Sequence, residues 1–289
     1  MQKPAILVTG AGGQLAQSIA DVSVAYPGFE FVFLTKTDMP LTDKAKVEAA
    51  FKMVSPRFCI NCAAYTAVDK AESDKESAFL VNAEAVKELA KTCAGTRTKL
   101  LHISTDYVFN GSSAIPYKET DPVDPVNVYG ASKAKGEEWA IAYNPGTIIV
   151  RTAWVYSEHG NNFVKTMLRL MKEKERLTIV NDQIGAPTYA PDIASALMKI
   201  ISSEHWLPGI YHYCNEGRIS WYDFAVAIKE LTGAACLLHP VPATAYPTPA
   251  RRPAFSLLDT SKIREKYGVK IFPWENSLKK CIHNLLQEG

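Results

Sequence analysis

Apolar residues along the first half of the chain alternate between short continuous runs and longer amphipathic segments. The short runs are rich in β-branched residues, as strands covered on both faces of a parallel sheet should be. They predict strands at 5–9, 31–34, 58–62, 99–104 and 147–150. Helical spacing occupies the intervening segments near 14–25, 43–54, 72–94 and 127–143. This order predicts an α/β fold with a doubly wound parallel sheet, Rossmann-like, with right-handed crossovers.

The pattern loosens after about residue 155. Helical stretches are separated there by loops that carry proline and glycine, and they lie near 160–174, 191–203, 220–232 and 274–287. We therefore expect a dinucleotide-binding domain over 1–155 and a smaller α/β substrate-binding lobe over 156–289. Some of the later segments are expected to return to the first domain.

Composition and charge favour a globular protein with a small-molecule partner. The 289 residues are 47% hydrophobic and 21% charged. A net charge of +2 indicates no nucleic-acid partner and no membrane surface. The first apolar run stops at Gly10, too early for a signal peptide or a membrane span, so a cytoplasmic location is predicted.

Six scattered cysteines indicate buried thiols in a chain of this length. Cys59 and Cys62 have the spacing of a metal knuckle. They lie in a strand-like run, where residues three apart point to opposite faces, so we do not expect zinc there.

The first predicted strand ends in a glycine turn from Gly10 to Gly13 that precedes a predicted helix. Such a turn lets the backbone approach a pyrophosphate, while the helix N-terminus supplies positive charge. The spacing is G-x-x-G-x-x-A rather than G-x-G-x-x-G, and glycine turns without a ligand are common. The β-α-β context nevertheless favours dinucleotide binding.

The second predicted strand ends at Thr35-Lys36, with no acid to hold the ribose hydroxyls of NAD. No carboxylate in this segment repels a 2′-phosphate, and Lys36 lies close by. We expect Gly10 and Thr35 to contact the cofactor, which is predicted to be NADPH, with NADH also accepted.

Tyr129 and Lys133 share one face of the helix predicted at 127–143. Taken alone, such a pair is more often a tyrosine and a lysine on a solvated helix. A second signal strengthens the functional interpretation, because hydroxyl and carboxylate groups at Ser104, Thr105 and Asp106 end a buried strand. Positions beyond the carboxyl end of a strand are where ligands bind in this fold class.

Together, the glycine turn, the segment STDYVF and the helix with YGASK resemble the extended short-chain dehydrogenase/reductase superfamily. Within it, the chain closely resembles the dTDP-4-dehydrorhamnose reductase family over nearly its whole length. The matching motifs lie at 63–73, 104–109, 151–156, 160–163, 181–188 and 245–250.

The resemblance implies reduction of the C4 ketone of dTDP-4-dehydro-L-rhamnose by a nicotinamide cofactor. A ketone that accepts hydride develops alkoxide charge, so the site needs a proton donor and hydrogen bonds to that oxygen. Tyr129 would be the acid and Thr105 the second donor. Lys133 would bind the ribose and lower the pKa of the phenol.

The same resemblance assigns binding residues. Asp106 and Trp154 would contact the sugar, although without the resemblance Trp154 would be interpreted as a core aromatic. The remaining cofactor contacts would be Gly13, Gln14, Leu15, Ala64, Tyr65 and Thr66.

Other functions remain open. Nucleotide-sugar epimerases and dehydratases share the glycine turn and the tyrosine–lysine pair. A dehydratase is expected to carry an acid pair after the threonine, whereas Asp106 is followed here by Tyr107. A catalytically idle nucleotide-binding subunit is the third alternative, and the intact Thr105, Tyr129 and Lys133 argue against it.

The chain departs from the family pattern at a metal site. Some relatives bind Mg²⁺ at a dimer interface through three glutamates, and the corresponding positions here are Ser18, Pro191 and Glu275. One carboxylate is a poor ligand set for Mg²⁺, with Asp192 as a partial substitute. We therefore expect no metal site and no metal-bridged homodimer.

Overall fold

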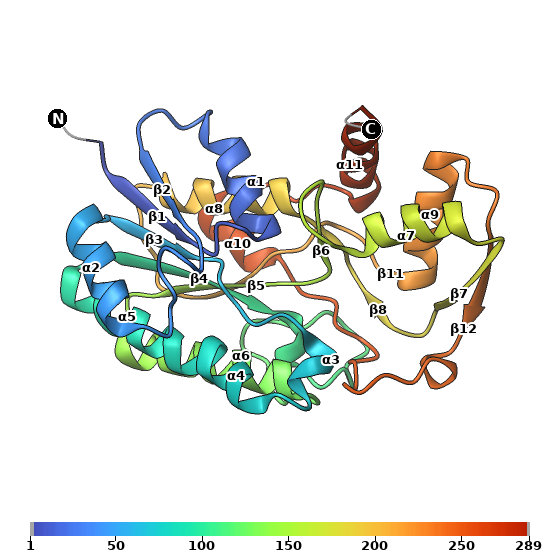
Figure 1. Cartoon of the computed structure of the whole chain (residues 1–289), viewed down its shortest axis with the longest axis horizontal. Helices are drawn as coiled ribbons and strands as arrows, with labels where there is room; N and C mark the ends of the chain where they lie inside the picture. The colour runs from blue at the N-terminus through green and yellow to red at the C-terminus, as the bar shows by residue number, and fades with distance from the viewer. Residues whose placement is uncertain (1–2, 288–289) are drawn as a thin grey trace.

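A six-stranded parallel sheet forms the centre of the larger lobe (Figure 1). The structure, a computed structural model, describes residues 3–287. Every pairing in the sheet is parallel. From one edge to the other, the strands are β10 (Gly209–His212), β5 (Ile148–Thr152), β4 (Lys99–Thr105), β3 (Phe58–Asn61), β1 (Ala5–Thr9) and β2 (Glu30–Leu34).

Helices cover both faces of this sheet (Figure 1). One face carries α1 (Gln14–Ser23), α8 (Ala190–Ile201) and α10 (Ser261–Tyr267), and the other carries α2 (Lys44–Val54), α5 (Ala85–Thr96) and α6 (Val128–Tyr143). Ile6 and Val8 point into the core under α1 and α8, whereas Leu7 points into the core under α2 and α5. The sheet is buried on both sides, and the predicted doubly wound α/β fold is confirmed.

Segments from the second half of the chain complete the larger lobe. β10 pairs with β5, with Tyr211 opposite Val150. α8 packs along α1, and Ile263 of α10 lies in the same core. The larger lobe is thus built from three stretches of chain: the first half, the segment that holds α8 and β10, and the segment that holds α10.

The second lobe holds three two-stranded sheets covered by three helices (right-hand side of Figure 1). The sheets pair β7 (Arg176–Val180) with β12 (Leu237–Val241), β8 (Ile184–Gly185) with β11 (Ile219–Ser220), and β6 (Val155–Tyr156) with β9 (Thr188–Tyr189). The helices are α7 (Phe163–Glu173), α9 (Trp221–Thr232) and α11 (Trp274–Gln287). Together they enclose a separate apolar core, which includes Phe224 and Leu278.

The helical spacing predicted near 72–94 is confirmed from residue 75 onward, with a π-helical turn inside the helical segment. The chain forms α3 (Val68–Ala71), α4 (Lys75–Phe79), a π-helical turn at Leu80–Glu84 and then α5. π-turns insert an extra residue into a helix and often occur at functional sites. This turn directs the buried Asn82 side chain toward Tyr65 and Ser132.

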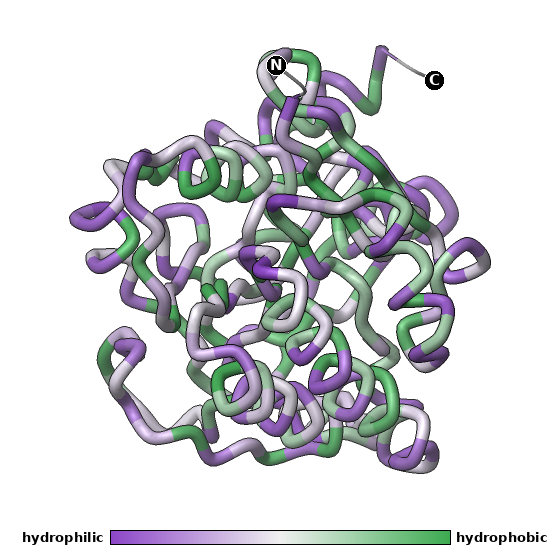
Figure 2. Tube along the Cα trace, turned by 90° about the vertical axis from the view of Figure 1, so that its left-hand side faces the viewer, coloured by the Kyte–Doolittle hydropathy of each residue, from purple (hydrophilic) through white to green (hydrophobic). Residues whose placement is uncertain are grey.

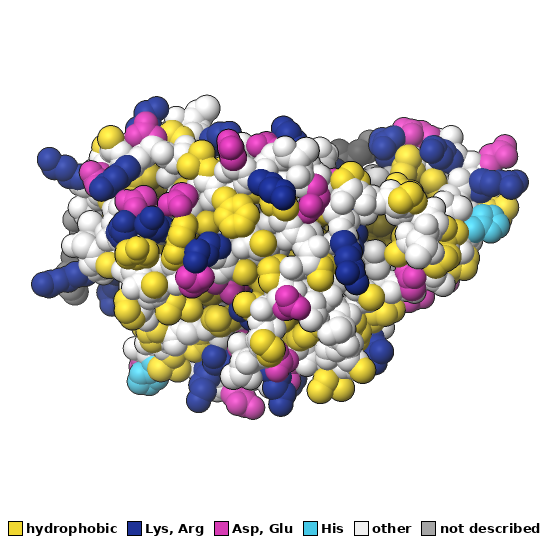
Figure 3. Space-filling model, turned by 90° about the horizontal axis from the view of Figure 1, so that it is seen from below, with side chains coloured by type: hydrophobic (Ala, Val, Ile, Leu, Met, Phe, Trp, Pro, Cys, Tyr) yellow, Lys and Arg dark blue, Asp and Glu magenta, His cyan; other side chains and the backbone are white. Residues whose placement is uncertain are grey.

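Polar and apolar residues separate as expected between surface and interior. In Figure 2, green stretches of the trace gather in the interior, and purple stretches are frequent at the outer turns. On the lower face, basic and acidic side chains are interspersed with apolar ones (Figure 3). Among residues 3–287, no helix has the length and apolar character needed to cross a membrane.

The two cysteines of the knuckle-like spacing point to opposite faces of β3. Cys59 lies in the core under α2 and α5, and Cys62 packs against the core on the other face. Both are free thiols. This opposite orientation confirms the strand geometry predicted for the pair.

Candidate active site

The residues predicted to form the site lie at the carboxyl edge of the six-stranded sheet. They follow β1, β2, β3, β4 and β5, or lie on α6. The strand order reverses between β1 and β3, since β1 has β2 on one side and β3 on the other. Ligands of open α/β sheets bind at such a switch point.

The turn after β1 is shaped for close approach to a ligand. Gly10 has φ +69°, and a Cβ there would lie 2.8 Å from the Ala63 nitrogen, so only glycine fits. The Gly13 nitrogen donates to the Gly10 carbonyl at 2.8 Å. Gly13 is the N-cap of α1 and has no side chain to cap the helix. The first N–H groups of α1 therefore suit the pyrophosphate of a dinucleotide.

Gln14 and Leu15 begin α1 and have different side-chain environments. Leu15 is buried in the core, so its backbone is the part available to a cofactor. The Gln14 Oε1 accepts hydrogen bonds from Ser157 Oγ at 3.2 Å and Asn162 Nδ2 at 2.9 Å. Gln14 therefore ties the glycine turn to the second lobe.

A carboxylate lies at the end of β2, which the sequence spacing did not reveal. Asp38 accepts hydrogen bonds from the Thr35 nitrogen at 2.9 Å and from Thr35 Oγ1 at 2.6 Å. These bonds lower the pKa of Asp38. The expectation that no acid lies here is wrong, because a local turn folds Asp38 back onto Thr35.

The segment after β3 is fixed to α6 by one buried side chain. Asn82 accepts from the Tyr65 nitrogen at 2.8 Å, and its amide donates to the Tyr65 carbonyl at 3.0 Å and to Ser132 Oγ at 2.9 Å. The backbone of Ala64, Tyr65 and Thr66 is thereby positioned against the helix that carries Tyr129.

Thr105 is the last residue of β4 and Asp106 follows it, and both are buried. Thr105 Oγ1 donates to Asp106 Oδ1 at 3.0 Å. The second carboxylate oxygen, Oδ2, is buried without a protein partner among residues 3–287. Burial raises the pKa of Asp106 to about 6, although polar groups nearby, among them Thr105, act in the opposite direction. An unpartnered buried acceptor suits a ligand hydroxyl.

Tyr129 lies beside Thr105. Burial raises the pKa of Tyr129 to about 12, and a hydrogen bond with Thr105 acts in the opposite direction. We had expected a lowered pKa from Lys133. The direction is reversed because burial dominates, and Lys133 is not among the groups that shift the pKa of this phenol.

Lys133 is buried one turn further along α6, with 2% of its surface exposed. Its Nζ donates to the Ile103 carbonyl at 2.7 Å. Burial lowers the pKa of Lys133 to about 8, although Glu137 and Cys62 favour its charged form. The ammonium therefore points into the sheet, next to β4.

Trp154 follows β5 in a strained backbone conformation with φ +48°. Its ring stacks on Trp221 at 3.6 Å between centroids and 13° between planes. Trp221 in turn lines a cavity of about 550 Å³ in the second lobe. Trp154 thus lies between the sheet edge and this cavity, rather than within a closed core.

The cavity is enclosed by α7, β7, α9 and the loop at 246–252. Arg252 of this loop forms an ion pair with Asp69 of α3 at 2.8 Å and lies near Tyr107. The ring of Tyr107 meets that of Tyr129 edge to face at 5.7 Å. The cavity therefore adjoins the Tyr129 site, and the sequence analysis had singled out neither Trp221 nor Arg252.

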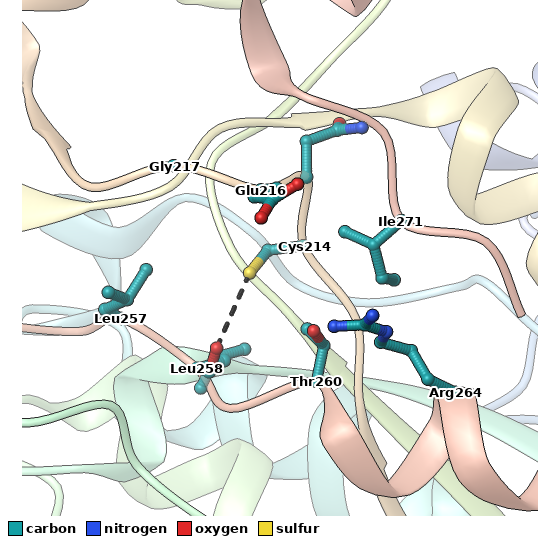
Figure 4. Close-up of a pocket in the computed structure, with 9 residues that line it drawn as sticks. Cys214, Glu216, Gly217, Leu257, Leu258, Thr260, Arg264 and Ile271 are labelled. Carbon is teal, nitrogen blue, oxygen red and sulfur yellow. Dashed lines mark hydrogen bonds between the residues drawn. The ribbon is translucent and has the colours of Figure 1, made fainter.

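A second cavity, of about 160 Å³, lies away from these residues (Figure 4). Its walls include Cys214, Thr260 and Arg264, and Cys214 Sγ donates to the Leu258 carbonyl at 3.8 Å. It contains none of the predicted site residues.

Of the positions related to the metal site of some relatives, Ser18 lies on α1, Pro191 on α8 and Glu275 on α11. Ser18 is buried in α1. The Asp192 carboxylate accepts hydrogen bonds from Asn215 and Ser277, so its Oδ2 is already engaged inside the protein. Among residues 3–287, no group of three or more histidine, cysteine, aspartate or glutamate residues could hold a metal ion.

The glycine turn at a switch point of the parallel sheet, with the buried Thr105 and Lys133 and the half-buried Tyr129 near its carboxyl edge, is typical of the short-chain dehydrogenase/reductase fold. The structure of UDP-glucose 4-epimerase from Thermus thermophilus shares this fold, with a TM-score of 0.84 at 22% identity over 98% of this chain and 99% of that one.

Closer comparisons identify the family. The model of the RmlD substrate binding domain matches residues 4–287. The dTDP-4-dehydrorhamnose reductase of Aggregatibacter actinomycetemcomitans is 45% identical over 95% of this chain and 97% of its own length. The reductase of that name from Bacillus anthracis, solved in complex with NADP, has a TM-score of 0.94 at 35% identity, covering 98% of this chain and all of that one. The chain belongs to the dTDP-4-dehydrorhamnose reductase family.

Proposed function

We propose that the protein reduces the C4 ketone of dTDP-4-dehydro-L-rhamnose with NAD(P)H to give dTDP-L-rhamnose. The observation that carries this proposal is the packing of α6, which carries Tyr129, against the end of β4, which carries Thr105, beside a cavity large enough for part of a nucleotide sugar. The family relationship supports the choice of substrate, and the NADP complex of the Bacillus anthracis relative supports the choice of cofactor.

The nicotinamide supplies the hydride when it is bound. The residues present fit such a cofactor, because the turn at Gly10 and the uncapped start of α1 accommodate a pyrophosphate. Tyr129 donates its proton to the ketone oxygen, and Thr105 donates a hydrogen bond to the same oxygen. Since burial raises the pKa of Tyr129, the phenol keeps this proton until the oxygen develops negative charge.

The remaining groups bind and orient the substrate. Asp106 Oδ2 accepts a hydrogen bond from a sugar hydroxyl, and Trp154 covers the sugar. Farther out, Trp221 offers an apolar face to the base, and Arg252 a positive charge to the diphosphate. The cavity beside Trp221 is thereby assigned to the nucleotide.

The direct test supplies dTDP-4-dehydro-L-rhamnose with NADPH and follows both the loss of NADPH absorbance and the identity of the product. Oxidation of NADPH in step with formation of the 4-hydroxy sugar supports the proposal. Stoichiometric NAD retained on the purified protein would indicate an epimerase instead. Substrate binding without turnover would indicate an idle nucleotide-binding subunit.

We expect NADPH to be used at least as well as NADH. The negative charge of Asp38 should make the preference for NADPH smaller than it would otherwise be. Its carboxylate lies at the end of β2, where acids select NAD in this fold class. Asp38→Asn is expected to raise the ratio of kcat/KM for NADPH over NADH about five- to tenfold, because one negative charge near the 2′-phosphate is removed. Asp43→Asn, which removes the same charge at the start of α2, is the control. An unchanged ratio in Asp38→Asn would remove Asp38 from cofactor selection.

We also expect the enzyme to be active without Mg²⁺ and to form no metal-bridged dimer. Of the three related positions, only Glu275 carries a carboxylate, and the nearby Asp192 is engaged by Asn215 and Ser277. Light scattering and the NADPH assay, each run with and without EDTA, test this expectation. A dimer that dissociates and loses activity on chelation would show that a metal site persists.

A further inference from the structure

A buried line of polar side chains runs from Lys133 across three strands. Lys133 Nζ lies 3.4 Å from His102 Nε2, and His102 Nδ1 lies 2.9 Å from Asn61 Nδ2. Thr9 Oγ1 donates to Asn61 Oδ1 at 2.6 Å and accepts from the Ala63 nitrogen at 3.2 Å. The line therefore connects the lysine of α6 to the strands that flank the switch point.

The sheet register puts these side chains on one face. Thr9 pairs with Asn61, and Asn61 pairs with His102. Each of these three side chains is at most 1% exposed. Burying a polar group without a hydrogen bond costs folding free energy, so these side chains must pair with one another. The line of contacts is therefore a specific feature of the fold.

The line supports two arrangements of protons. In the first arrangement, Asn61 Nδ2 donates to His102 Nδ1. The imidazole proton is then on Nε2, which faces Lys133. This arrangement satisfies a neutral amine, which can accept. An ammonium has only donors, so it requires an unprotonated Nε2, a proton on Nδ1 and an Asn61 amide turned by half a rotation.

We propose that His102, held by Asn61, is a positioning residue for Lys133 that accepts a hydrogen bond from its ammonium and changes tautomer when that charge is lost. The proposal deepens the proposed function and rests on it, since the family resemblance assigns Lys133 to the ribose of the cofactor that this function requires. His102 touches neither cofactor nor substrate in this role and acts through Lys133.

The titration behaviour of the two groups agrees with this geometry. Burial lowers the pKa of His102 well below its usual value, and Lys133 lowers it further, so the imidazole stays neutral. Burial lowers the pKa of Lys133 to about 8, so its charge changes near neutral pH. The other titratable groups that act on Lys133 are Cys62 on the β3 side and Glu137 on its own helix.

Removal of the His102 acceptor costs the ammonium more than the amine, because a charge-assisted hydrogen bond is the stronger one. The pKa of Lys133 then falls. If the ammonium is the active form, the loss of kcat/KM at alkaline pH begins at a lower pH. We expect His102→Leu to shift this limb down by about one pH unit and to lower kcat/KM at pH 8 about fivefold.

Two further variants separate positioning from packing. His102→Gln retains an acceptor at the place of Nε2 and is expected to restore the limb to within about 0.3 pH unit of wild type. His212→Leu removes another buried histidine of the same sheet, which contacts Arg151 and the Tyr117 carbonyl, and is expected to leave the limb in place. A His102→Leu limb that coincides with wild type, or an equal shift in His212→Leu, overturns the proposal.

Side-chain ¹⁵N NMR of the wild-type protein tests the tautomer without any variant or turnover. We expect His102 to stay neutral and to move its proton from Nδ1 to Nε2 over the pH range in which the Lys133 amine titrates. A single tautomer throughout that range overturns the proposal. Wild-type protein that shows this exchange but does not reduce dTDP-4-dehydro-L-rhamnose would refute the proposed function alone.

Discussion

We expect Tyr129→Phe to lower kcat by about 10² to 10⁴, because the substitution removes only the proton donor and general acid catalysis typically contributes this much. The ring of phenylalanine fills the same space, including the edge-to-face contact with Tyr107. The fold and the Kd for NADPH should therefore stay close to wild type. Single-turnover kinetics and fluorescence titration with NADPH measure the two quantities separately.

Tyr143→Phe is the matched control for this variant. Tyr143 is the last residue of the same helix and is 42% exposed, so loss of its hydroxyl is expected to leave turnover unchanged. Turnover of Tyr129→Phe within a few-fold of wild type would exclude Tyr129 as the proton donor. A large loss in both variants would indicate a general effect on α6 instead.

Local sequence signals were sufficient for the larger lobe because its strands are covered on both faces. Alternate residues such as Leu7 and Val8 face different cores, which requires an unbroken apolar run. The turn at Gly10 was predictable for a similar reason, since both its positive φ and its contact with Ala63 demand glycine. Tyr129 and Lys133 were found because helical spacing places them on one face.

The missed features depend on contacts that linear spacing does not encode. Asp38 reaches Thr35 only through a local turn. Trp221 and Arg252 come from distant parts of the second lobe, and the positions of short strands and loops there are set by tertiary packing. The π-turn around Asn82 also depends on tertiary contacts. The buried Asn82 amide has hydrogen-bond partners on two other elements, and these favour a π-turn over a regular helix.

The position of His102 next to Asn61 and Thr9 follows from the register of the parallel strands. Its polar neighbours Thr9 and Asn61 lie on separate strands, and nothing in their spacing along the chain links them. Once the parallel register is known, all three fall on one line that leads to Lys133. The order of the strands, rather than any single motif, therefore identifies this part of the site.

The close packing of α6 against the π-turn leads to a prediction about stability. A Cβ added to Gly136 would lie 2.0 Å from the Asn82 carbonyl oxygen, which is backbone and cannot rotate away. Either the helix or the turn must move. Overpacking of this kind lowers the free energy of unfolding by about 1 to 3 kcal/mol. We expect Gly136→Ala to lower the free energy of unfolding by about 3 kcal/mol and to weaken NADPH binding, since Tyr129 and Lys133 move with the helix.

Gly95→Ala provides the control, because Gly95 is also helical but a Cβ there meets no described atom within 4 Å. Alanine restricts the unfolded chain and favours the helix, so the free energy of unfolding should rise by about 0.4 to 1 kcal/mol. Urea denaturation of both variants measures the difference in sign. If Gly136→Ala is as stable as Gly95→Ala, then α6 and the π-turn have room to separate, and Asn82 does not fix the position of the helix that carries Tyr129.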